Sequence, residues 1–120
     1  MYIVKNNEKF WTSLDSLLAE SEIEIDRPKG TAHPKNSEMV YPVDYGFLKS
    51  TNSPDNAGID IYIGSMKDPI IDAVICTVDL YKKDSEIKIL FGCDDDEKDK
   101  IFKIYSEYYE TLQGILIRRK

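Results

Sequence analysis

Residues 59–63 alternate strictly between apolar and polar side chains, and this pattern constrains the fold more than any other feature of the chain. Three isoleucines point to one side of an extended segment, and Asp60 and Tyr62 point to the other. Four further segments are rich in β-forming residues and end at turn residues, namely 21–26, 38–49, 71–81 and 85–92. The chain is therefore expected to build a sheet with an aliphatic face and a face that carries carboxylates and tyrosines.

Two segments have helical rather than strand periodicity. Residues 7–20 repeat apolar side chains at helical spacing, and a second apolar stripe runs from about residue 95 to Leu112. Three aspartates precede the second stripe and would stabilise the positive end of a helix, and Gly114 is expected to end it. Five or six short strands with a helix at each end predict an α+β fold, a small closed β-barrel.

The remaining segments are rich in turn-forming residues. Two prolines and a glycine predict a loop over residues 27–38, and a second loop is expected over 50–58. The last residues, 115–120, read either as a short strand or as a tail.

Composition narrows the class of protein. The 120 residues, with 42% apolar and 32% charged side chains, suit one domain over 1–120. The net charge of −6 argues against nucleic acid as a partner, and no apolar run is long enough to span a membrane. The first ten residues lack the pattern of an export signal, so Cys76 and Cys93 are expected to be free thiols in a cytoplasmic protein.

Several carboxylates lie on the polar side of the predicted strands. Asp60 follows Asp55 at the end of a loop that could fold back beside it, and Glu86 shares a strand face with Lys88. Any one of these carboxylates is best explained as part of an ordinary solvated surface. For Asp55 and Asp60 together, a divalent-metal site explains the pattern as well as a solvated surface does. The single histidine, His33, lies in a Pro/Gly loop and is either an ordinary loop residue or a site residue.

Three motifs, in this order and at these separations, resemble a known family. They are EIDRPKGTAHP, YPVDYGF and SPDNAGIDIYIG, within residues 22–64. They are similar to the metal-dependent, barrel-forming soluble inorganic pyrophosphatases, and most similar to the short bacterial relatives. The resemblance implies a small OB-like barrel and the hydrolysis of pyrophosphate, or of another small phosphoanhydride, by a water activated by Mg²⁺, with Mn²⁺ as an alternative.

The resemblance also implies roles for individual residues. It implies a catalytic group made of Tyr45, Asp55 and Asp60. It implies a set that binds the phosphate-containing substrate, made of Arg27, His33, Lys35, Tyr41, Lys88 and Tyr108. It implies metal ligands at Asp55, Asp60, Glu86 and Glu24. A homo-oligomer is a further expectation from the resemblance.

The chain also departs from the family pattern. Ala57 stands where the family's metal loop has its middle aspartate, and Tyr109 stands where a lysine follows the helix tyrosine. A further acidic residue of the family has become Tyr81 or has moved to Asp84. The hairpin with which the family brings a lysine and an arginine to the phosphates is missing, so the loop over 27–38 would have to supply this positive charge.

Three hypotheses follow. The first is a pyrophosphatase, and the second is a catalytically silent relative that binds phosphate, a nucleotide or a partner protein, as the loss of a carboxylate at Ala57 would favour. The third is an interaction module that uses the helix over 7–20, with Trp11 exposed, as its contact surface.

Overall fold

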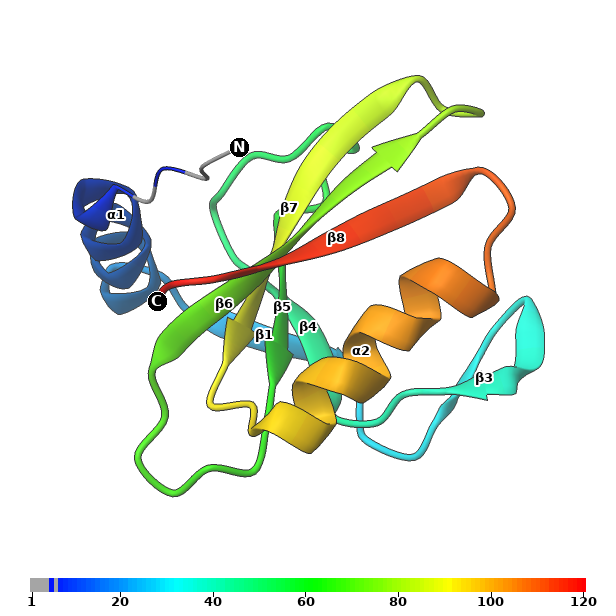
Figure 1. Ribbon diagram of the computed structural model, residues 1–120, viewed down its shortest axis with the longest axis horizontal. Helices are drawn as coiled ribbons and strands as arrows, with labels where there is room; N and C mark the ends of the chain where they lie inside the picture. The colour runs from blue at the N-terminus through cyan, green and yellow to red at the C-terminus, as the bar shows by residue number, and fades with distance from the viewer. Residues whose placement is uncertain (1–4, 6) are drawn as a thin grey trace.

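The computed structural model describes residue 5 and residues 7–120. Helix α1 spans Glu8–Ala19 and helix α2 spans Asp95–Glu107 (Figure 1). The main sheet contains β1 (Ile23–Arg27), β4 (Asp44–Leu48), β5 (Ile59–Ile63), β6 (Ile71–Asp79), β7 (Asp84–Phe91) and β8 (Leu112–Arg118). A separate two-stranded hairpin consists of β2 (Ala32–His33) and β3 (Asn36–Val40).

The main sheet has the strand order β1-β4-β5-β7-β6-β8. All neighbouring strands are antiparallel except β5 and β7, which are parallel. This confirms the α+β class and the six strands. No pairing joins β1 to β8 within residues 7–120, so closure of the sheet into a barrel is not confirmed.

The two helices cover opposite faces of this sheet. Trp11 and Leu14 of α1 pack with Ile61, Val74 and Ile89 on one face. On the other face, α2 packs over a second cluster, made of Met39, Tyr41, Val43, Tyr62, Ala73, Ile75, Leu90, Cys93, Ile101, Ile104 and Tyr105. The strict alternation over residues 59–63 therefore separates a mainly aliphatic core, which also holds Trp11, from a core rich in tyrosine.

Both helix starts follow the sequence prediction. The side chain of Asn7 accepts a hydrogen bond from the Lys9 backbone and caps α1. Asp94 caps α2 in a capping box with Glu97, and the acidic first turn complements the helix dipole. The expected exposure of Trp11 is wrong: its side chain is only 1% exposed, because it fills the space between α1 and the sheet.

The end of α2 also differs from the prediction. The helix stops at Glu107, and the segment from Leu112 continues as β8, paired with β6. Gly114 therefore lies inside a strand rather than after a helix, and a Cβ there would meet Tyr105 and Ile75 at 3.0 Å. Pairing with β6 outweighs the helical position of Leu112, and of the two alternatives for residues 115–120 the strand is confirmed as far as Arg118. The glycine lets α2 approach the sheet closely.

The segment over 27–38 is more ordered than the predicted loop. It contains the β2–β3 hairpin, which lies near the C-terminal end of α2 (Figure 1). His33 pairs with Asn36, and Tyr41, directly after β3, is buried in the core beneath α2.

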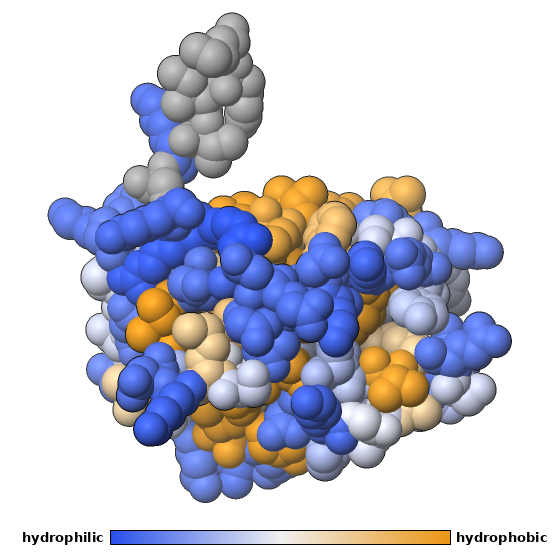
Figure 2. Space-filling view, turned by 60° about the horizontal axis from the view of Figure 1, so that its bottom comes forward, coloured by the Kyte–Doolittle hydropathy of each residue, from blue (hydrophilic) through white to orange (hydrophobic). Residues whose placement is uncertain are grey.

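Polar side chains cover most of the face shown in Figure 2, and apolar residues appear there as separate patches. Scattered apolar groups of this kind are normal for a folded domain. Among the described residues, no helix combines the length and apolar character needed to cross a membrane.

Candidate active site

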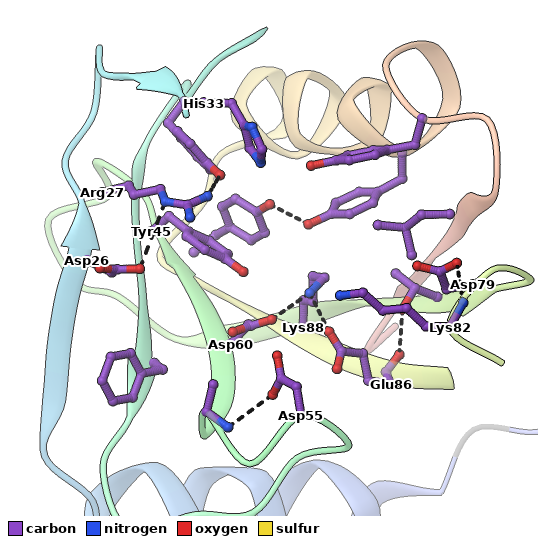
Figure 3. Close-up of a pocket in the computed structure, with 18 of the residues that line it drawn as sticks. Asp26, Arg27, His33, Tyr45, Asp55, Asp60, Asp79, Lys82, Glu86 and Lys88 are labelled. Carbon is purple, nitrogen blue, oxygen red and sulfur yellow. Dashed lines mark hydrogen bonds and ion pairs between the residues drawn. The ribbon is translucent and has the colours of Figure 1, made fainter. Parts of the chain in front are cut away.

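Strand register brings the predicted site residues together on the α2 face of the sheet. Asp60 of β5 pairs with Lys88 of β7, and Tyr45 of β4 pairs with Tyr62 of β5. Glu86 lies two residues before Lys88 and therefore on the same face. These residues line a pocket of about 840 Å³ (Figure 3).

Lys88 lies between two carboxylates. Its Nζ donates to Asp60 Oδ2 at 2.5 Å and to Glu86 Oε1 at 2.6 Å. Burial alone would lower the pKa of Lys88, but the acidic groups around it, first Tyr45 and then Asp60, outweigh burial and raise that pKa. The ammonium group therefore stays charged at any ordinary pH and holds both carboxylates in place.

Tyrosines form the wall beside this ion-pair group. The rings of Tyr45 and Tyr62 lie 4.8 Å apart, and the hydroxyls of Tyr62 and Tyr105 share a hydrogen bond of 2.5 Å. Burial is the main cause that raises the pKa of all three phenols. The Tyr45 hydroxyl, which Asp60 also influences, therefore remains protonated and can donate to a carboxylate or to a bound oxyanion.

The loop before β5 places Asp55 at the same pocket. Asp55 Oδ1 accepts a hydrogen bond from Ser53 Oγ at 2.6 Å and one from the Ala57 backbone at 3.0 Å. The bond from Ser53 is the main cause that lowers the pKa of Asp55. The loop thus fixes an ionised carboxylate that points toward Asp60 and Glu86 (Figure 3).

Basic and aromatic groups form the opposite end of the pocket (Figure 3). Arg27 Nη1 donates to the Tyr41 hydroxyl at 2.6 Å, and its guanidinium lies 5.6 Å from the centre of the Tyr41 ring. His33 lies 6.3 Å from the rings of both Tyr41 and Tyr109. Burial, Arg27 and Lys35 lower the pKa of His33, so it is mostly neutral near pH 7.

The pocket carries an excess of negative charge. Six carboxylates and four basic side chains line it, so an anion binds there favourably only when cations accompany it. Within residues 7–120, however, no three His, Cys, Asp or Glu side chains lie close enough to hold a metal ion by themselves. Asp60 and Glu86 are kept from forming such a group with a third side chain because the ammonium of Lys88 lies between them. The carboxylates of the pocket are oxygen ligands, the type that divalent cations such as Mg²⁺ prefer.

Most of the predicted site residues meet in this pocket. Nine of them line it: Arg27, His33, Lys35, Tyr41, Tyr45, Asp55, Asp60, Glu86 and Lys88. Glu24 does not line the pocket and lies 3.5 Å from the ammonium of Lys49. Tyr108 also lies outside it, 40% exposed at the end of α2, and its neighbour Tyr109 lines the pocket instead. Of the two residues considered for the displaced acidic position, Tyr81 is 84% exposed and Asp84 lines the pocket.

Sequence reasoning missed several residues of the site. Tyr62 lines the pocket, as its position two residues from Asp60 on one strand face could have shown. Tyr105 was assigned only to a helical apolar stripe, and its hydroxyl contact with Tyr62 depends on how α2 crosses the sheet. The pocket wall near the β6–β7 turn was missed entirely; it contains Thr77, Asp79, Lys82 and Thr111.

Comparisons with known proteins bear on the fold. No family model matches the sequence, and no curated protein matches it. Three solved structures are similar: an inorganic phosphatase from Anaplasma phagocytophilum and inorganic pyrophosphatases from Coxiella burnetii and Helicobacter pylori. Their TM-scores are 0.53, 0.52 and 0.52, at 16%, 16% and 14% identity. Each match covers 82% of this chain, and 81%, 82% and 81% of the three matched chains in the same order. The resemblance in the sequence motifs is thus confirmed at the level of the fold, which this chain shares with bacterial inorganic pyrophosphatases.

Proposed function

We propose that this chain hydrolyses inorganic pyrophosphate, or another small phosphoanhydride, with the help of a divalent cation. One observation carries the proposal: a single pocket joins three carboxylates, a buried lysine and a protonated tyrosine. Such an arrangement combines donors for phosphoryl oxygens with ligands for a cation. The pyrophosphatase fold adds support.

The residues of the chain divide the work. Lys88 and Arg27 donate hydrogen bonds to phosphate oxygens, and the Tyr45 hydroxyl orients the attacking water or a phosphate oxygen. Asp55, whose pKa is lowered, stays ionised and would hold the cation together with Asp60. A bound Mg²⁺, or Mn²⁺, would neutralise phosphate charge and lower the pKa of a bound water.

The overall reaction adds one water to one pyrophosphate. The water oxygen bonds to a phosphorus atom, the bridging P–O bond breaks, and two phosphates leave. The proton released by the water passes to a carboxylate that lines the pocket, and position 57, an alanine, supplies none.

The first experiment is phosphate release from Mg²⁺-pyrophosphate by the wild type, Asp60→Asn and Glu24→Gln. Glu24 is the matched control, since it is an acidic residue in the same sheet but outside the pocket. We expect Asp60→Asn to lower the rate by about 10²-fold or more and Glu24→Gln to retain it. A wild type that releases no phosphate with either Mg²⁺ or Mn²⁺ would refute the proposal.

A second candidate function is binding without hydrolysis. The absence of a carboxylate at Ala57 favours it, because general-base help is worth about 10²–10⁴-fold in rate. Calorimetric binding of pyrophosphate without any phosphate release would establish this function. We further propose a cytoplasmic location, since both cysteines are free thiols.

A further inference from the structure

The pocket is larger and more aromatic than a small inorganic anion requires. Its volume of about 840 Å³ lies near the upper end of the range for sites that hold whole organic ligands, about 300–1,000 Å³. Five tyrosines and His33 line it, and His33 lies at the end of the pocket away from Asp55 (Figure 3). An inorganic diphosphate can accept hydrogen bonds from tyrosine hydroxyls, but it has no apolar surface that could pack against the faces of these rings.

Three of these tyrosines already have a structural role. Tyr41, Tyr62 and Tyr105 are at most 3% exposed and belong to the core beneath α2. Core packing therefore explains them fully. It leaves His33, Tyr45 and Tyr109 as partly exposed rings of the pocket. Tyr45 lies beside Asp60 and belongs to the charged end, so His33 and Tyr109 are the two rings without an assigned role.

His33 and Tyr109 form a corner of two aromatic rings. Their planes meet at 83° with centroids 6.3 Å apart, and the ring of Tyr105 stacks with that of Tyr109 at a centroid distance of 6.1 Å. A planar heterocycle can lie flat on one ring of this corner while its edge meets the other. His33 suits this use, since it is mostly neutral near pH 7.

Arg27 connects this corner to the charged end of the pocket. Its guanidinium contacts Tyr41, which stacks on His33 on one side and on Tyr45 on the other. Tyr45 in turn lies beside Asp60 and Lys88. The order along the pocket is therefore aromatic corner, arginine, then the buried lysine and its carboxylates (Figure 3).

We propose that the pocket binds a nucleoside diphosphate, with its base in the corner formed by His33 and Tyr109 and its phosphates between Arg27 and Lys88. This inference rests on the proposed function, because it uses the same phosphate end of the pocket. The bond hydrolysed is then the anhydride between the α- and β-phosphates. Water adds to the β-phosphorus, and a nucleoside monophosphate and inorganic phosphate leave.

The test compares two probes that cannot be hydrolysed. Methylenediphosphonate and the α,β-methylene analogue of ADP carry the same P–C–P linkage and differ by the nucleoside, and calorimetry with Mg²⁺ present gives both Kd values. We expect the wild type to bind the nucleotide analogue about tenfold more tightly or better, as stacking of one base commonly allows.

Two neighbouring tyrosines provide matched variants. Tyr109→Ala should remove most of the preference for the nucleotide analogue, and Tyr109→Phe should keep it because the ring remains. Tyr108→Ala is the control, since Tyr108 lies outside the pocket, and it should also keep the preference. If the wild type binds both probes equally, or if Tyr109→Ala weakens both to the same degree, the inference is overturned.

These results are separable from the proposed function. A chain that prefers the nucleotide analogue but releases no phosphate from any anhydride refutes the hydrolase and supports the nucleotide site. A chain that hydrolyses pyrophosphate and shows no preference between the probes supports the hydrolase and refutes the nucleotide site.

Discussion

Lys88→Met tests how much the fold depends on the buried charge at the centre of the pocket. The lysine is 5% exposed and donates hydrogen bonds to Asp60 and Glu86 at 2.5 and 2.6 Å. Methionine keeps most of the volume but leaves two carboxylates facing each other without a cation. Removing one partner of a buried ion pair costs about 3–5 kcal/mol. We expect the free energy of unfolding to fall by this amount near pH 7, a large share of the about 5–15 kcal/mol typical of a domain.

The stability of the Lys88→Met variant should also depend on pH in a definite direction. Without the ammonium, the negative charges of Asp60 and Glu86 repel each other in the folded variant, and binding a proton at one of them relieves this repulsion. The folded variant then binds more protons than the unfolded chain, so its stability rises as the pH falls from about 7 to about 5. In the wild type the folded pKa of Lys88 is raised, so its stabilising contribution is complete below the ordinary lysine pKa and does not change over this interval.

The assay is urea unfolding followed by the fluorescence of Trp11, the single tryptophan, which is buried and therefore sensitive to unfolding. Lys49→Met is the control, because Lys49 also lies near two carboxylates, at 3.8 and 3.5 Å, but on the exposed surface. Its loss should cost less than about 1 kcal/mol. The reasoning is refuted if Lys88→Met is no more destabilised than Lys49→Met, or if acidification does not restore stability to it.

Three further predictions concern single positions. Trp11→Ala should lower the free energy of unfolding by about 3–5 kcal/mol, because it empties the core under α1. The measurement is a thermal or urea transition followed by circular dichroism. The control, Phe10→Ala, changes a side chain that is 43% exposed and should cost far less. Gly46→Ala should destabilise the protein by about 2 kcal/mol or more in the same measurement, since the new Cβ would clash with a backbone carbonyl of β1. A loss below about 0.5 kcal/mol would show that β1 moves aside freely. Ala57→Asp should raise the rate of pyrophosphate hydrolysis, by up to about 10²-fold, if the missing carboxylate limits the wild type, and an unchanged rate would show that it does not.

Local pattern was enough to predict much of the fold. Period-two alternation placed Asp60 and Tyr62 on the face opposite three isoleucines, and α1 and α2 indeed cover these two faces separately. The caps at Asn7 and Asp94 follow from residue type and position alone. Such features depend on side chains within a few residues of one another, so a single sequence contains them.

Contacts between distant segments had to come from the tertiary structure. The parallel pairing of β5 with β7 places Lys88 against Asp60, and no local pattern shows which strands become neighbours. The same holds for the end of α2: the helical stripe runs on to Leu112, yet pairing with β6 starts a strand at this residue, and Tyr109, not Tyr108, lines the pocket.

The sequence by itself determined which side chains share a face of each strand, and hence that carboxylates, a lysine and tyrosines would be available for a site. Only the tertiary structure decided that Lys88 lies between Asp60 and Glu86, that Glu24 lies elsewhere, and that two rings remain exposed at the edge of the pocket. The physical reason is that face and capping follow from backbone periodicity, whereas strand order and helix crossing are set by the burial of the whole apolar surface at once.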